Sequence, residues 1–264
     1  MIEAVIFDWA GTTVDYGSLA PVIAFKKAFK NAGIELSDED VRKDMGMAKW
    51  DHIGKILKLE DVKQQWEKKY SKLPDNDDRK KIYNDFQQSL LRYLKEYTEL
   101  KSGVLKTFNY LKEYGIKVAT TTGYTAEMMK VVKNKAAEDG YTPELVVTSE
   151  DVDGLGRPSP AMIQLIMKDF NIDDPKKVIK VGDTLVDIEE GRNAGVKTVG
   201  IVEGSSLMGL SQVEFDELDN EEQIAKRNEV KRKFESVDAD FVIDSIFDLV
   251  QIIEYLNESM DKKW

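Results

Sequence analysis

The sequence contains no cysteine, only one histidine, no long apolar run and no excess of basic residues. Without cysteine it forms no disulfide, thiolate nucleophile or thiolate metal site, which fits a reducing compartment. No apolar run reaches the length of a membrane-spanning helix. The 49 acidic and 38 basic residues give a net charge of −11, which repels nucleic acid and anionic lipid. We therefore expect no nucleic-acid partner and no membrane partner.

The N-terminal residues also lack a signal segment. Met1 leads directly into a short apolar run that ends at Phe7, with no basic region, signal core or cleavage site. This predicts a cytoplasmic location. The length of 264 residues is enough for one large domain or for a core with a smaller inserted domain.

Short runs rich in valine and isoleucine alternate with helical patterns along most of the chain. Such an alternation is typical of an α/β fold in which a doubly wound parallel sheet is covered by helices. One amphipathic helix is expected from Gly103 to Tyr114, with Gly115 at its end. The expected strands are 2–8, 116–121, 144–148, 178–182, 197–202 and 240–243.

The exception to this alternation is the stretch from Ser18 to Thr98, which has no strand signal. Pro21 suits the first position of a helix, Gly33 suits its end, and Ser37 suits the cap of a second helix. Three more helices are expected near 48–57, 61–73 and 77–96. A segment of this length far exceeds an ordinary loop. We therefore predict a helical cap domain at 18–98, inserted into a core of 1–17 and 99–264, and an exposed helix within the charge-rich residues 211–238.

Polar residues follow four of the expected strands, at the edge where parallel sheets bind ligands. Asp8 ends the first strand, and Thr122 with Gly123 follows the second. Arg157 lies in the loop after the third strand, and Asp183 and Asp187 follow the fourth. Each signal is weak alone, because an aspartate after a strand is often a turn or cap residue. Four in order make coincidence improbable.

In order and spacing these residues resemble the four motifs of the haloacid dehalogenase superfamily. The resemblance implies that Asp8 attacks phosphorus to form an aspartyl phosphate, while Thr122 and Arg157 stabilise the other phosphoryl oxygens. In phosphatases of this superfamily, a second aspartate two residues later protonates the leaving oxygen. This chain has Ala10 there. The protein is therefore either inactive or acts on a leaving group that needs no proton on oxygen.

Phosphoryl transfer of this kind uses Mg²⁺ held by oxygen ligands. Asp8 and Asp183 offer carboxylates, and Ala10 still offers its backbone carbonyl. Asp187 is expected to support these ligands from behind or through a water molecule. We therefore predict a magnesium site formed by Asp8, Ala10 and Asp183.

Lys49 and His52 provide a reason for Ala10. A carbon–phosphorus bond breaks heterolytically when the carbon accepts the electrons, and an imine between a lysine and an aldehyde is such an acceptor. Lys49, as a neutral amine, is the candidate imine former, and His52, three residues later on a helix, is the candidate proton shuttle. Most helical lysines are solvated and most lone histidines are structural. Here, however, an imine at Lys49 would explain the missing acid at position 10, and the missing acid favours a catalytic role for Lys49.

The motifs resemble the phosphonoacetaldehyde hydrolase (phosphonatase) family over nearly the whole chain. The matching segments are 7–17, Met45-Gly46 with Lys49 and His52, 121–125, 156–158, 182–184 and 204–206. The resemblance implies a Rossmann-like core with a helical cap, Mg²⁺ dependence and a homodimer. It also implies hydrolysis of phosphonoacetaldehyde to acetaldehyde and phosphate in the degradation of 2-aminoethylphosphonate. By the same resemblance Lys49 forms the Schiff base, His52 lies at the aldehyde end, and the substrate contacts come from Met45, Gly11, Thr12 and Tyr124.

The chain departs from some members of that family at Ser18, where a cysteine occurs, and at Ala48 and Trp50 beside Lys49. Two alternatives stay open at this point. One is an ordinary phosphomonoesterase or phosphomutase, which Ala10 opposes because an ester leaving group would lack its acid. The other is a silent phosphate-binding protein that kept the fold, for which Lys49 would be an accident.

Overall fold

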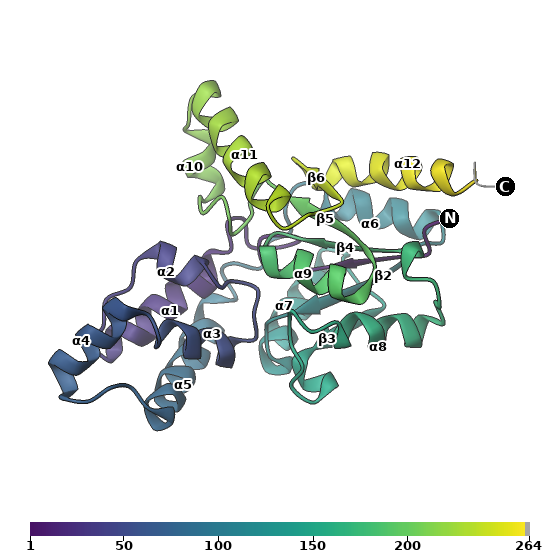
Figure 1. Cartoon of the computed structure of the whole chain (residues 1–264). Coiled ribbons are helices and arrows are strands. Elements are labelled where there is room, and N and C mark those ends of the chain that lie inside the picture. The colour runs from purple at the N-terminus through teal and green to yellow at the C-terminus, as the bar shows by residue number, and fades with distance from the viewer. Residues whose placement is uncertain (262–264) are drawn as a thin grey trace.

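The structure, a computed structural model, describes residues 1–261 and is organised around one parallel sheet (Figure 1). The sheet has the strand order β3-β2-β1-β4-β5-β6, with every neighbouring pair parallel. The predicted α/β fold is confirmed, and each expected strand is present. The strands are β1 (Ala4–Phe7), β2 (Lys117–Thr122), β3 (Leu145–Thr148), β4 (Val178–Gly182), β5 (Lys197–Ile201) and β6 (Phe241–Ile243).

Helices cover both faces of the sheet, which explains why its strands are apolar on both sides. Val5 and Phe7 of β1 pack with α6 (Val104–Glu113), α7 (Ala126–Glu138) and α12 (Leu249–Asp261). Ala4 and Ile6 face the other way, toward α8 (Ala161–Phe170). On that second side, α9 (Leu185–Ala194) packs against α11 (Asn220–Glu235). The sheet is therefore doubly wound.

The stretch between β1 and α6 is helical, as expected. Its helices are α1 (Leu19–Asn31), α2 (Asp38–Arg42), α3 (Lys49–Ile56), α4 (Glu60–Tyr70) and α5 (Asn76–Tyr93). We call residues 18–98 the helical insert. α1 to α5 lie beside the carboxyl ends of the strands (Figure 1). The division of the chain into core and cap domains at these residues stays a prediction.

One detail of the first helix was predicted wrongly. α1 begins at Leu19, so Pro21 is its third residue and not its first. The cause is Asp15, whose two carboxylate oxygens accept hydrogen bonds from the backbone N–H groups of Leu19 (2.9 Å) and Ala20 (3.1 Å). These bonds satisfy the donors of an earlier first turn. Pro21 is still tolerated, because an N–H at this position has no partner within the helix.

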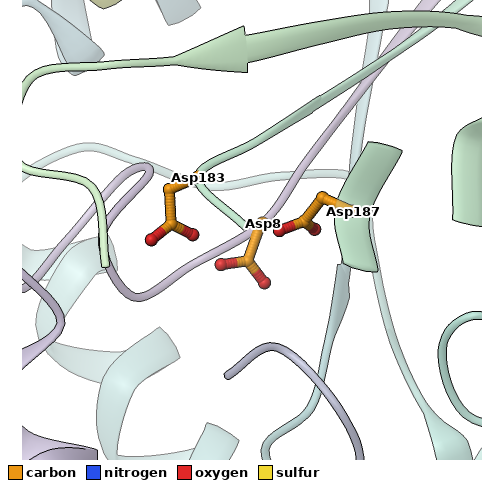
Figure 2. Close-up of side chains that lie close together, drawn as sticks. All are labelled: Asp8, Asp183 and Asp187. Atoms are coloured by element: carbon orange, nitrogen blue, oxygen red, sulfur yellow. The ribbon is translucent and has the colours of Figure 1, made fainter. Parts of the chain in front are cut away.

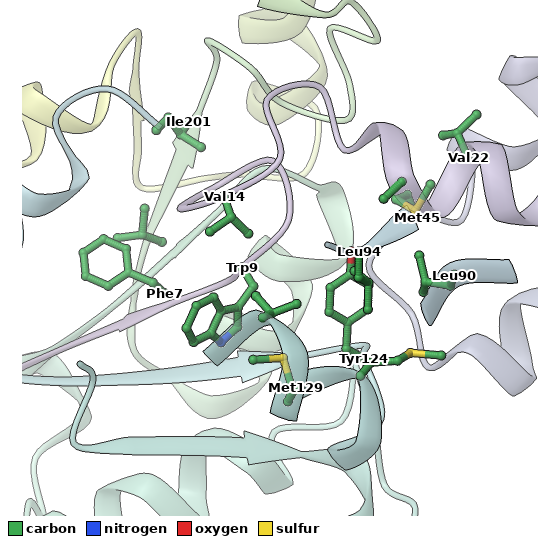
Figure 3. Packing of buried hydrophobic residues seen from close by; sticks show 14 of the residues in the cluster. Phe7, Trp9, Val14, Val22, Met45, Leu90, Leu94, Tyr124, Met129 and Ile201 are labelled. Atoms are coloured by element: carbon green, nitrogen blue, oxygen red, sulfur yellow. The ribbon is translucent and has the colours of Figure 1, made fainter. Parts of the chain in front are cut away.

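The helical insert packs directly on the rest of the chain. One hydrophobic cluster includes Val22 and Leu90 of the insert together with Trp9 and Met129 (Figure 3). The backbones also approach closely: a Cβ atom added to Gly123 would lie 2.5 Å from the carbonyl oxygen of Met47. This packing closes the insert over the carboxyl ends of the strands.

The charge-rich residues 211–238 contain the predicted exposed helix, α11, preceded by α10 (Gln212–Asp216). These two helices project from the body of the molecule (Figure 1). Single 3₁₀ turns occur at Ser149–Val152, Pro175–Lys177 and Ile246–Asp248. Within residues 1–261, no helix combines the length and the apolar character needed to cross a membrane.

Candidate active site

The carboxyl ends of the neighbouring strands β1 and β4 bring three aspartates together. Asp8 directly follows β1 and Asp183 directly follows β4, and the chain winds away from these two strands in opposite directions. Asp187, in the first turn of α9, lies beside them (Figure 2). Each of the three offers an oxygen within 4.8 Å of the others. The sequence prediction that these strand ends converge is confirmed.

Arg157 holds this carboxylate cluster together through three ion pairs. Its guanidinium nitrogens lie 2.7 Å from Asp8 Oδ1, 2.9 Å from Asp187 Oδ1 and 3.0 Å from Glu190 Oε2. Arg157 is 3% exposed, so these contacts are shielded from water. Burial alone would lower its pKa, but Asp187, Asp8 and Glu190 outweigh this effect and the pKa is raised. Arg157 is therefore a permanent cation beside Asp8.

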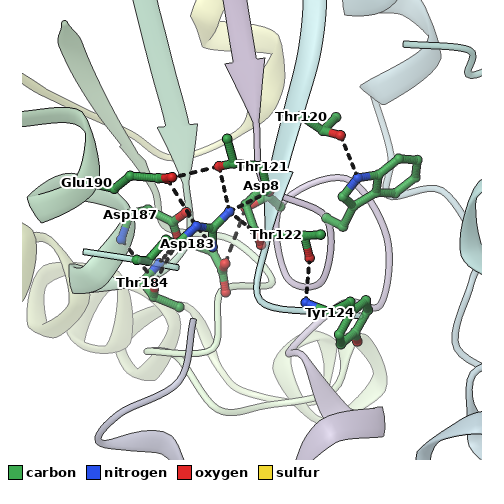
Figure 4. Close-up of polar contacts among 12 residues, drawn as sticks. Asp8, Thr120, Thr121, Thr122, Tyr124, Asp183, Thr184, Asp187 and Glu190 are labelled. Atoms are coloured by element: carbon green, nitrogen blue, oxygen red, sulfur yellow. Dashed lines mark hydrogen bonds and ion pairs between the residues drawn. The ribbon is translucent and has the colours of Figure 1, made fainter. Parts of the chain in front are cut away.

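Sequence reasoning missed two further members of this network, Lys180 and Glu190. Lys180 Nζ lies 2.9 Å from Asp187 Oδ1 and 3.4 Å from Glu190 Oε2, and it donates to the hydroxyl of Thr121 at 2.9 Å. The Thr121 hydroxyl in turn donates to Glu190 Oε2 at 2.9 Å (Figure 4). The signal in the sequence was a lysine in the middle of an apolar strand, since a lysine is almost never fully buried unless it is paired.

Asp183 is bound on one side by backbone and hydroxyl donors. Its Oδ2 accepts a hydrogen bond from the backbone N–H of Ser206 at 2.7 Å, and its Oδ1 accepts one from the Thr12 hydroxyl at 3.3 Å. Gly11 has a φ of +82°, and a Cβ atom there would lie 2.1 Å from Asp183 Oδ2. Glycine is thus required at position 11 for Asp183 to approach the loop after β1.

The pKa values of the three aspartates are shifted in different directions. Burial raises the pKa of Asp8, against the attraction of Arg157, and burial together with Asp8 and Asp187 raises the pKa of Asp183 well above its usual range. Burial also opposes ionisation of Asp187, but Arg157 and Lys180 outweigh it and the pKa is lowered. Arg157 and Lys180 both bind Asp187 Oδ1, and Thr184 donates to Oδ2 at 2.6 Å. Both carboxylate oxygens of Asp187 therefore already have partners within the protein.

The donor set at Asp8 and Asp183 fits a hard divalent cation. These two carboxylates line one cavity with Ala10, which offers its backbone carbonyl, and there is neither a sulfur nor an imidazole ligand among the three. All-oxygen donor sets of this kind suit Mg²⁺, which also keeps water ligands. The residues present fit the predicted metal.

Lys49 faces this cavity from the first residue of α3. It is 5% exposed, and its Nζ lies 5.5 Å from the ring centre of Tyr124 and 4.0 Å from Met45 Sδ. No carboxylate among residues 1–261 lies within ion-pair distance of Nζ. Burial lowers the pKa of Lys49 to about 8, against the attraction of Asp8. Lys49 is thus an amine that loses its proton more readily than an ordinary lysine.

His52 is buried on the same helix but does not line the cavity. Its ring packs against Phe25, with 4.4 Å between the ring centres. Neither ring nitrogen has a hydrogen-bond partner in the described part of the chain. Burial and the nearby Lys49 lower the pKa of His52 well below its usual range, although a backbone contact with Val41 opposes this shift. His52 is therefore harder to protonate than an ordinary histidine, and it is buried on the same helix as Lys49.

The cavity between insert and core has a volume of about 20 Å³, which is room for about one water molecule. A substrate therefore enters only when the insert moves or the lining side chains rearrange. Thr122 lines the cavity, and its hydroxyl accepts the backbone N–H of Tyr124 at 3.1 Å. Of the expected site residues the cavity is lined by Asp8, Ala10, Met45, Lys49, Thr122, Tyr124, Arg157 and Asp183.

The three departures from the family pattern lie in different surroundings. Ser18 lines the cavity. Trp50 is 37% exposed and packs against Tyr83 and the guanidinium of Arg79, away from the lining residues. Ala48 lies beside Gly156, where an added Cβ atom would be 3.1 Å from its own. Only Ser18 of the three borders the cavity itself.

The fold and the convergence of Asp8, Thr122, Arg157 and Asp183 at its strand ends define a class of hydrolases. Residues 2–195 match the haloacid dehalogenase-like hydrolases, and the chain belongs to this family. Within the family it groups with the phosphonoacetaldehyde hydrolases. One of these, from Latilactobacillus sakei subsp. sakei (strain 23K), is 46% identical over 252 residues, which are 96% of this chain and 95% of the relative.

Two further relatives agree with this grouping. A bifunctional phosphonoacetaldehyde hydrolase/aminoethylphosphonate transaminase from Clostridioides difficile (strain 630) is 41% identical over 252 residues, which are 96% of this chain and 40% of that protein. The crystal structure of a phosphonoacetaldehyde hydrolase-like protein from Oleispira antarctica superimposes with a TM-score of 0.96 at 35% identity, covering 100% of this chain and 95% of that one.

Proposed function

We propose that this protein hydrolyses the carbon–phosphorus bond of phosphonoacetaldehyde to acetaldehyde and phosphate. The observation that carries the proposal is a single cavity lined by Asp8, Ala10 and Lys49. Asp8 lines the cavity and is the candidate nucleophile toward phosphorus. Lys49 is an amine of lowered pKa that no carboxylate of residues 1–261 pairs with, and position 10 lacks the acid that an ester leaving group needs. The names of the relatives support the same substrate.

In the first step we propose, the neutral amine of Lys49 adds to the aldehyde carbon. The aldehyde oxygen takes one proton from the amine and one from solvent and leaves as water, which gives a protonated imine. The positive charge of this imine makes the neighbouring carbon an electron acceptor. Tyr124 and Met45 bound the space around Nζ and exclude water from it. His52 is buried three residues after Lys49 on the same helix, and we propose that it exchanges protons with the amine.

In the second step a carboxylate oxygen of Asp8 attacks phosphorus and the carbon–phosphorus bond breaks. Its electron pair forms an enamine on Lys49, and the phosphoryl group becomes an aspartyl phosphate on Asp8. Arg157 and Thr122 hold the remaining phosphoryl oxygens, and Gly11 and Thr12 contribute the loop that surrounds them. Mg²⁺, held by Asp8, the Ala10 carbonyl and Asp183, would neutralise charge on the same oxygens. Protonation of the enamine carbon and two hydrolyses then release acetaldehyde and phosphate.

The substrate aldehyde is the product expected from removal of the amino group of 2-aminoethylphosphonate. We propose that this protein acts in the degradation of that compound, which the fused aminoethylphosphonate transaminase of the Clostridioides difficile relative supports. The homodimer and the cytoplasmic location inferred from the sequence stay predictions.

Replacing Ala10 by aspartate distinguishes this function from that of an ordinary phosphatase. We expect Ala10→Asp to hydrolyse phosphonoacetaldehyde more slowly than the wild type, because a third carboxylate joins Asp8 and Asp183. We expect no more than a small gain on an alkyl phosphate ester. Phosphate release from both substrates is measured, with Ala10→Asn as a control of the same shape without the acid. A gain of about 10²–10⁴-fold on the ester, the usual effect of a general acid, would instead identify a phosphatase that lost its acid.

The pH dependence of turnover should follow Lys49. Burial lowers its pKa to about 8, so the amine becomes neutral as the pH rises through that value. We therefore expect kcat/KM for phosphonoacetaldehyde to rise about tenfold per pH unit below pH 8 and to level off above it. The lowered pKa of His52 keeps that ring neutral over the same range. Initial rates from about pH 6 to 9 test this, and a flat profile would contradict the role of Lys49.

A further inference from the structure

Arg42, at the end of α2, joins the helical insert to two other segments. Its Nη1 donates to the carbonyl oxygen of Gly17 at 2.8 Å and to that of Ser206 at 3.1 Å. Gly17 immediately precedes the insert, and Ser206 belongs to the loop that follows β5. No carboxylate within residues 1–261 lies at ion-pair distance from Arg42. Its guanidinium therefore binds backbone carbonyl oxygens instead of an acidic side chain.

Ser206 connects this contact to the predicted metal site. Its carbonyl oxygen accepts from Arg42, while its backbone N–H donates to Asp183 Oδ2 at 2.7 Å. Within residues 1–261, the other oxygen of Asp183 has only the longer 3.3 Å hydrogen bond from the Thr12 hydroxyl. Ser206 is 1% exposed, so water does not compete for either of its backbone groups. The orientation of Asp183 therefore depends chiefly on the loop that Arg42 holds.

Two glycines allow this loop to lie close to the insert. Gly209 has a φ of +74°, and a Cβ atom there would lie 3.3 Å from Arg42 Nε. Gly17 has a φ of +84°, and a Cβ atom there would lie 2.3 Å from the carbonyl oxygen of Leu210. The N–H of Gly17 also donates to the carbonyl oxygen of Gly204 at 2.8 Å. The contact is thus a fitted junction between the insert and residues 204–210.

We propose that Arg42 is a positioning residue that couples the seating of the helical insert to the orientation of Asp183. When α2 moves away from the core, the guanidinium leaves Ser206, and the N–H that holds Asp183 loses its support. The site is then complete for metal and substrate only while the insert is closed. This inference rests on the proposed function in one respect, namely that Asp183 holds the metal.

The test compares Arg42→Met, which keeps the length of the side chain but removes its donors, with Arg42→Lys, which keeps the charge. Mg²⁺ binding is measured by calorimetry without substrate, and the exchange of the Ser206 amide is measured by hydrogen–deuterium exchange. We expect Arg42→Met to bind Mg²⁺ about tenfold more weakly and to exchange the Ser206 amide faster, because supporting partners of metal ligands typically change affinity by about 10–100-fold. Arg42→Lys should restore part of both effects.

The matched control is Arg192→Met, since Arg192 also donates to a backbone carbonyl, that of Val237 at 2.7 Å, but touches neither the insert nor Asp183. We expect it to leave Mg²⁺ binding and Ser206 exchange unchanged. An Arg42→Met protein that melts at a lower temperature yet keeps both properties would show that Arg42 is only structural, and it would overturn the proposal. Neither measurement uses substrate, so a wild type that fails to hydrolyse phosphonoacetaldehyde would contradict the proposed function and leave this test intact.

Discussion

Lys49→Arg should release phosphate from phosphonoacetaldehyde at least about 10⁴-fold more slowly than the wild type, the scale of loss seen when a covalent catalytic group is removed. Arginine keeps the positive charge and most of the length of the side chain, but its pKa above about 12 leaves no neutral nitrogen to form an imine. The cavity around Nζ, lined by Met45 and Tyr124, would still be filled. The loss therefore reports the chemistry of the amine and not the packing.

Borohydride trapping locates the imine directly. Reduction in the presence of phosphonoacetaldehyde should convert Lys49 of the wild type to a stable secondary amine, which peptide mass mapping identifies. Lys55→Arg is the matched control, because Lys55 is on the same helix but is exposed and paired with Asp44 at 2.6 Å. Near-normal turnover by Lys49→Arg, or trapping at another lysine of the wild type, would refute the Schiff-base mechanism.

The sheet and the polar residues at its strand ends could be predicted because both follow from local rules. Buried parallel strands are short apolar runs, and the carboxyl ends of such strands meet at one edge. Asp8 and Asp183 therefore had to converge once their strands were neighbours. Lys49 was singled out as a candidate through a chemical argument that combined its type with the missing acid at position 10. Its lowered pKa is a property of the folded protein, which surrounds the amine with apolar groups.

Other parts of the site depend on contacts between distant residues, and no local pattern reveals them. Lys180 is visible in the sequence as a charged residue in an apolar strand. Its partner Thr121 lies 59 residues away, and only the packing of the sheet brings the two together. His52 was expected at the aldehyde end, but its ring packs against Phe25 of α1 and does not line the cavity. The contact of Arg42 with Ser206 spans 164 residues and involves backbone groups, which carry no signal in the sequence.

Asp8→Asn should abolish phosphate release while leaving the imine on Lys49 intact. The amide has nearly the shape of the carboxylate but is a poor nucleophile toward phosphorus, so we expect phosphate release to fall by about 10⁴-fold or more. Imine formation needs a neutral Lys49, and the negative charge of Asp8 raises the pKa of that amine against the effect of burial. Removing the charge lowers the pKa further, so a larger share of Lys49 is neutral at pH 7.

This variant therefore separates the two covalent steps. Borohydride should trap at least as much adduct on Lys49 of Asp8→Asn as on the wild type, and no aspartyl phosphate should form. Arg157 keeps Asp187 and Glu190 as partners, at 2.9 Å and 3.0 Å, so the site retains its buried cation in a paired state. Asp51→Asn, an exposed change on α3, is the control for effects of the substitution itself.

If Asp8→Asn still released phosphate at the wild-type rate, Asp8 could not be the nucleophile. Loss of the adduct together with phosphate release would mean that Asp8 is required to form the imine, and the two steps would then have to be merged into one.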